Sequence, residues 1–140
     1  MSKIGFHYFP DTNHFRNTDL KRWLPRLKEL QAGWLTIQAP EERAIPEHFI
    51  KEIRKADIEP VLHFDLRPDQ LPTQDSLRLL FTTYARWGVS YVILFDRPNL
   101  RSRWGSMSWA RSDLVERFLD LYIPLVEEAV KAGLSPIFPP

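Results

Sequence analysis

The chain has 140 residues, a length that suits one globular domain, and it is 44% hydrophobic and 26% charged, which excludes a mostly disordered chain. Its net charge of +1 gives no strong overall attraction to nucleic acid or to an anionic membrane. Because there is no cysteine, disulfides, thiolate metal sites and a cysteine nucleophile are excluded. The amino end carries no apolar segment long enough for a signal peptide or a membrane span, which predicts a soluble, by default cytoplasmic, protein.

The amino-terminal part of the chain alternates between two kinds of pattern. The apolar and aromatic run 4–9 predicts a first strand. Leucines and a tryptophan at helical spacing predict a helix over 20–30, and Gly33 is a natural residue for ending it. A second strand is predicted at 34–37. A second helix follows over 46–53, where the initial proline suits the first helical turn.

The same alternation continues through the middle of the chain. A third strand is predicted at 61–64, and a third helix over 77–84. The run 91–95 is continuously apolar, which is typical of a strand buried on both faces.

The carboxyl-terminal part adds one helix and one strand. Ser112 is a good N-cap and Asp113 suits the first turn, so a helix is predicted to begin there and to run through 114–129. Gly133 ends it, and 136–138 predicts a fifth strand.

The predicted order is five strands alternating with four helices. Strands joined by single helices are expected to be parallel, so the fold class is α/β. A TIM-barrel-like (β/α) arrangement fits, but a closed barrel usually needs roughly 250 residues. We therefore predict a single barrel-like domain over 1–140 that is truncated after the fifth strand. The alternative is a flavodoxin-like doubly wound sheet, which periodicity alone does not distinguish.

Polar side chains follow the predicted strands at the edge where such folds bind ligands. The candidate binding residues are His7, Asp65, Asp96, Arg97, Asn99 and Trp104. Aromatic faces with polar neighbours suit a saccharide.

The distinctive segment is 88–100, which reads Gly-Val-Ser-Tyr-Val-Ile-Leu-Phe-Asp-Arg-Pro-Asn-Leu and is followed by Trp104. It resembles the fourth strand of the large clan of glycoside hydrolases that have (β/α)₈ barrels and paired glutamates. In that clan the strand runs from Gly-Val-x-Tyr to Asn-Glu-Pro-Asn-Leu, and its glutamate is the general acid/base. The resemblance implies a barrel fold and hydrolysis of O-glycosyl bonds.

The chain departs from this pattern at the catalytic position. Asp96 and Arg97 stand where the clan has its asparagine and glutamate. An arginine is always charged and cannot donate a proton to a leaving oxygen, whereas retaining hydrolysis needs two carboxyl groups about 5–5.5 Å apart. The clan's second glutamate comes from a seventh strand, which this chain does not reach. The expectation is a degenerate or incomplete member with a saccharide pocket, and no catalytic residue is assigned.

Two functions of other classes stay open. One is a non-catalytic assembly module, in which open strand edges pair with a second copy or with a missing carboxyl-terminal half. The other is a metal-dependent hydrolase that uses His7, His63 and Asp65, because imidazole and carboxylate are common ligands of zinc and manganese. No other cofactor, no nucleic acid and no membrane is expected.

Overall fold

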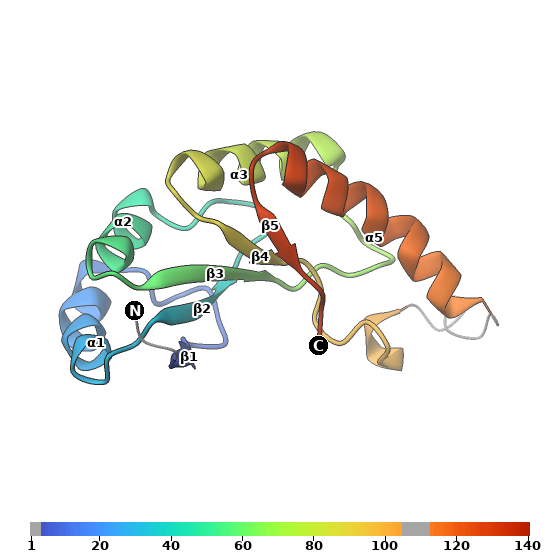
Figure 1. Cartoon of the computed structure of the whole chain (residues 1–140). Coiled ribbons are helices and arrows are strands. Elements are labelled where there is room, and N and C mark those ends of the chain that lie inside the picture. The colour runs from blue at the N-terminus through green and yellow to red at the C-terminus, as the bar shows by residue number, and fades with distance from the viewer. Residues whose placement is uncertain (1–3, 105–112) are drawn as a thin grey trace.

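The computed structural model describes residues 4–104 and 113–140, and it contains one sheet of five parallel strands (Figure 1). The strands are β1 (Gly5–His7), β2 (Trp34–Ala39), β3 (Glu59–Phe64), β4 (Tyr91–Ile93) and β5 (Ser135–Ile137). They lie side by side in chain order, β1-β2-β3-β4-β5, and every pairing is parallel. The predicted α/β class and parallel strands are confirmed.

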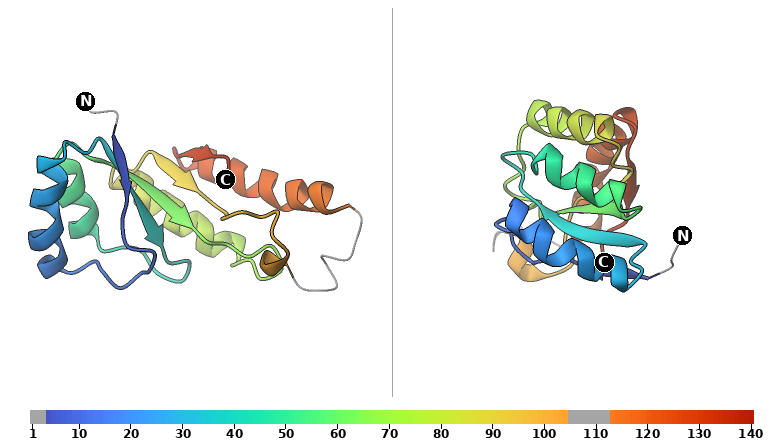
Figure 2. Two further views of the ribbon diagram at one scale, coloured as in Figure 1. Left: turned by 90° about the horizontal axis from the view of Figure 1, so that it is seen from below. Right: turned by 90° about the vertical axis from the view of Figure 1, so that its left-hand side faces the viewer.

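The α-helices of the described residues lie between successive strands. They are α1 (Asn17–Glu29), α2 (Glu47–Lys55), α3 (Gln74–Arg86) and α5 (Leu114–Lys131), and a short 3₁₀ turn, η1 (Arg101–Arg103), follows β4. Figures 1 and 2 show them along one side of a curved sheet. This is expected, because right-handed crossovers between strands in sequential order place every helix on the same face.

The strand order decides between the two architectures. A doubly wound sheet reverses direction at a switch point and carries helices on both faces. Here the order never reverses, so the flavodoxin-like alternative is wrong and the sheet is part of a barrel.

Most predicted strand positions agree with the structure, and the fourth strand differs. Its ladder ends at Ile93, although Leu94 and Phe95 are both fully buried. Beyond Ile93 the apolar residues are therefore buried without pairing as a strand. At the last helix, Asp113 is the N-cap, while the expected cap Ser112 lies outside the described residues.

The core lies between the sheet and the helices. Alternate strand residues, such as Ile37, Leu62 and Val92, are completely buried against the helices. Tyr84 of α3 is also fully buried, and its hydroxyl accepts a hydrogen bond of 2.8 Å from the backbone N–H of Ile45. Burial raises the pKa of the Tyr84 hydroxyl to about 12, so this oxygen stays protonated. The bond fixes the loop after β2 against α3.

The opposite face of the sheet is concave and open (Figure 1). Trp34 and Tyr91 are partly exposed on it. The Trp34 indole occupies the space that a Cβ at Gly5 would fill, so glycine at this position allows the ring to lie across β1. In closed barrels this face is the packed interior.

Candidate functional site

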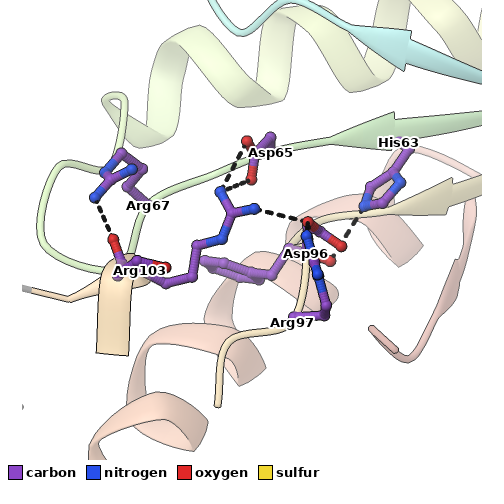
Figure 3. Close-up of polar contacts among 8 residues, drawn as sticks. His63, Asp65, Arg67, Asp96, Arg97 and Arg103 are labelled. Carbon is purple, nitrogen blue, oxygen red and sulfur yellow. Dashed lines mark hydrogen bonds and ion pairs between the residues drawn. The ribbon is translucent and has the colours of Figure 1, made fainter. Parts of the chain in front are cut away.

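The carboxyl ends of β3 and β4 bring together the polar residues of the site (Figure 3). His63 is the next-to-last residue of β3, Asp65 follows that strand, and Asp96 and Arg97 follow β4. Because β3 and β4 are paired, with His63 beside Ile93, these side chains meet at one edge of the sheet.

Arg103 is at the centre of this cluster. Its Nη1 donates to both carboxylate oxygens of Asp65, at 2.8 and 3.0 Å, and its Nη2 donates to Oδ2 of Asp96 at 2.7 Å. The side chain is only 16% exposed, and its Nε is buried without a partner in the described residues. One guanidinium thus joins the ends of two strands by contacting both carboxylates.

Asp96 has a second basic neighbour. Arg97 donates to the same Oδ2 through Nε and Nη2, at 3.3 and 3.1 Å, while its side chain remains mostly exposed. The backbone of Arg97 has φ of +42°, a left-handed conformation that costs a residue with a Cβ about 1 kcal/mol. Such strained residues cluster at ligand-binding and catalytic sites.

His63 lies beside the ion pairs and is 8% exposed. Its Nε2 is 3.4 Å from the carbonyl oxygen of Phe95, which favours a proton on Nε2 and leaves Nδ1 as an acceptor. Burial lowers the pKa of the imidazole, although the carbonyl contact and the carboxylates of Asp96 and Asp65 oppose this. The side chain is therefore a neutral hydrogen-bonding group at neutral pH.

The lowered pKa of His63 gives a stability prediction. Unfolding exposes an imidazole that binds protons more readily, so the stability that His63 contributes is present above its unfolded pKa, about 6.5, and is lost as pH falls toward the lower folded value. We expect urea denaturation to show a smaller loss of stability between pH 7.5 and 5.5 in His63→Gln than in the unmodified chain. His48→Gln is the control, because that side chain is exposed. Equal losses in the chain and in His63→Gln would contradict the prediction.

The remaining predicted residues lie around the cluster. His7 is exposed on β1, and Asn99 is exposed in the turn after β4. Trp104 follows η1 but is only 6% exposed, and its Nε1–H donates to the carbonyl of Pro98 at 2.7 Å. The Arg117 guanidinium lies 5.3 Å from the centre of the Trp104 ring. Trp104 therefore packs under the turn that holds Asn99.

The metal-dependent hydrolase is not supported. Within 4–104 and 113–140, no group of three or more histidines and carboxylates is arranged to hold a metal ion, and this includes His7, His63 and Asp65. The physical reason is that Asp65 is directed toward Arg103. The described residues therefore do not gather His7, His63 and Asp65 into one cluster of ligands.

Sequence reasoning missed the bridging role of Arg103. It placed Asp65 and Asp96 at neighbouring strand ends, but it did not place Arg103 between them. The sequence did hold a signal for this role. Two acidic residues follow adjacent parallel strands, and an arginine comes seven residues after the second.

Comparisons with known proteins support the fold. No protein-family model and no curated protein matches the chain. A solved structure of an L-ribulose 3-epimerase aligns over 99% of this chain with a TM-score of 0.64 and 13% identity. The chain spans 49% of that enzyme's length. At this identity the likeness establishes the fold alone, which is part of a (β/α) barrel. Among the described helices, none has the length and apolar character needed to cross a bilayer.

Proposed function

We propose that this chain is a carbohydrate-binding barrel domain that lacks two-carboxylate hydrolysis. The observation that supports it most is the convergence of His63, Asp65, Asp96 and Arg103 at the carboxyl ends of β3 and β4. In parallel barrel folds this edge is where ligands bind. The similarity to a sugar epimerase adds weight to a small sugar or polyol as the ligand.

The side chains at this edge suit hydroxyl groups. Asp65 is half exposed, so its carboxylate retains acceptor capacity beside its contact with Arg103. His63 offers Nδ1 as an acceptor, and the exposed Arg97 and Asn99 supply donors. His7 lies on the same concave face of the sheet, where its ring would close one side of the pocket. A sugar needs such a mixture of acceptors and donors.

The same geometry argues for a glycoside-hydrolase-like frame without that activity. The acid position is held by Arg97, whose guanidinium does not release a proton at any relevant pH. Asp96 accepts hydrogen bonds from both Arg97 and Arg103, so its carboxylate is already engaged by two guanidinium groups. A protonated acid and a free carboxylate nucleophile are both needed for retaining hydrolysis.

Calorimetric titration tests this proposal with L-ribulose, other ketoses, polyols and short oligosaccharides. We expect saturable binding of at least one of them, and at least tenfold weaker binding by Asp65→Asn, which removes a charged acceptor. Asp69→Asn is the matched control, because Asp69 is an exposed carboxylate four residues farther along the same loop. Circular dichroism verifies that each variant is folded. No heat of binding with any ligand, from a folded chain, would overturn the proposal.

A further inference from the structure

The outer surface of α5 carries an apolar stripe that the described residues do not cover. It consists of Val115, Leu119, Ile123, Val126 and Val130. Their spacing of four, four, three and four residues places them on one side of the helix. Val115, Ile123 and Val130 are each more than half exposed, and the other two are half-buried.

The stripe faces the open edge of the sheet. The opposite side of α5 contacts α3, where Glu128 accepts hydrogen bonds of 2.9 and 3.2 Å from Arg78. Viewed down the helix axis, Glu128 lies on the side opposite the centre of the stripe, given 3.6 residues per turn. The stripe is therefore turned away from α3, toward the side where a further helix of a barrel would pack.

The other edge of the sheet carries an apolar groove. It has a volume of about 390 Å³ between β1 and α1, and its apolar lining includes Phe6, Phe9, Trp23, Leu27 and Leu30. It lies on the side of α1 away from α2, because Leu24 and Lys28 face α2. The two edges of this half-barrel thus offer a projecting apolar helix and an apolar groove.

Charges beside the stripe and the groove are complementary. On α5, Glu116, Asp120 and Glu127 are exposed in a row next to the stripe. On α1, Arg26 lines the groove and Arg22 lies one turn before it. Over the whole helices, α5 has four acidic and two basic residues, whereas α1 has four basic and two acidic residues.

Part of the concave face, beside Glu59, is also apolar. Trp34, Val61, Tyr91 and Ile137 line a hollow of about 320 Å³ there, and three of these four side chains are exposed. Parallel sheets are ordinarily covered on both faces. A partner that reached both edges would also cover this face.

We propose that this partner is a second copy of the chain. In the resulting dimer, α5 of each protomer packs into the α1 groove of its partner around a two-fold axis, and the acidic row lies against Arg22 and Arg26. The α5–α1 contact would reproduce the parallel neighbouring helices seen within the chain between α1 and α2. Pro136 of β5 has no N–H to donate, so the helices rather than a continuous strand ladder carry the contact. This proposal is independent of sugar binding.

Sedimentation equilibrium of the full chain tests the dimer. We expect a mass of about twice 16.6 kDa, with dissociation into monomers on dilution. Ile123→Glu should weaken association at least tenfold, because it places a carboxylate in the apolar groove. Leu79→Glu is the control, because Leu79 is also an exposed apolar residue but lies on α3, away from both edges. A chain that stays monomeric at all concentrations would overturn the proposal. Association only with a different chain, one that supplies further barrel strands, would overturn it as well.

Chemical cross-linking tests the geometry of the contact. Because the chain has no cysteine, Arg26→Cys and Glu127→Cys can be introduced separately and joined by a flexible bismaleimide. We expect cross-linked dimers when the two variants are mixed, and none when Lys51→Cys, on exposed α2, replaces Arg26→Cys. The double variant should give covalent dimers only. A ladder of larger species would show an open, head-to-tail assembly and would overturn the two-fold dimer.

Discussion

Replacement of Arg103 by methionine is expected to destabilise the fold by about 2–3 kcal/mol. The variant keeps the apolar stem but removes the charge that joins Asp65 and Asp96. Loss of one partner of a buried ion pair costs about 3–5 kcal/mol, and the half-exposed Asp65 reduces this figure because water still solvates it. Asp65 would then lose its contact with Arg103, and Asp96 would keep only its ion pair with the exposed Arg97.

Urea denaturation at pH 7 measures this effect, and a triple variant isolates its cause. Arg101→Met is the control, since Arg101 is an exposed arginine in the same turn and should change stability by no more than about 0.5 kcal/mol. Adding Asp65→Asn and Asp96→Asn to Arg103→Met removes the two carboxylate charges and should restore part of the loss. If Arg103→Met were as stable as Arg101→Met, the bridging role would be refuted.

Replacement of Phe95 by alanine is expected to have the larger effect, about 3–5 kcal/mol. Phe95 is 1% exposed, and its ring packs edge-on against Phe118, with ring centres 5.1 Å apart, and in a tilted arrangement against Tyr122, with ring centres 6.1 Å apart. These contacts attach the end of β4 to α5. The cavity left by the ring would weaken that attachment, and it would also disturb the carbonyl that contacts His63.

Thermal and urea denaturation at one fixed protein concentration check this expectation. Phe138→Ala is the matched control, because Phe138 also contacts Tyr122, with ring centres 5.4 Å apart, but is 66% exposed. It should lose about 1 kcal/mol or less. A loss in Phe95→Ala no greater than that in Phe138→Ala would mean that the aromatic contacts around Phe95 do not anchor α5.

The sequence predicted the elements better than their pairing. Apolar runs and helical spacing reflect burial, and burial is what alternate residues such as Ile37 and Leu62 experience in the structure. Which strands pair is a property of the whole chain, so the sequential order that identifies a barrel had to come from the structure. For the same reason the apolar run 91–95 predicted two more paired residues than β4 contains.

The sequence predicted the site only in part. Asp65 and Asp96 were expected at one edge because parallel strands end together, and they do lie there. The path of the loop after β4 has no periodic signal, so neither the return of Arg103 to both carboxylates nor the burial of Trp104 followed from the sequence. The ion pairs of Arg103 with Asp65 and Asp96 therefore depend on the loop after β4, whose conformation the sequence pattern did not predict.

The sequential strand order also bears on how the chain folds. Every strand pair is formed by strands that follow one another in the chain, so each pairing closes a short loop and has a small entropic cost. The β2–β3 register extends over six residue pairs, whereas each of the other pairings covers three. Folding would therefore begin at β2 and β3 and add units outward in both directions. In the native state the amide protons of these two strands would exchange with solvent last, after those of the edge strands.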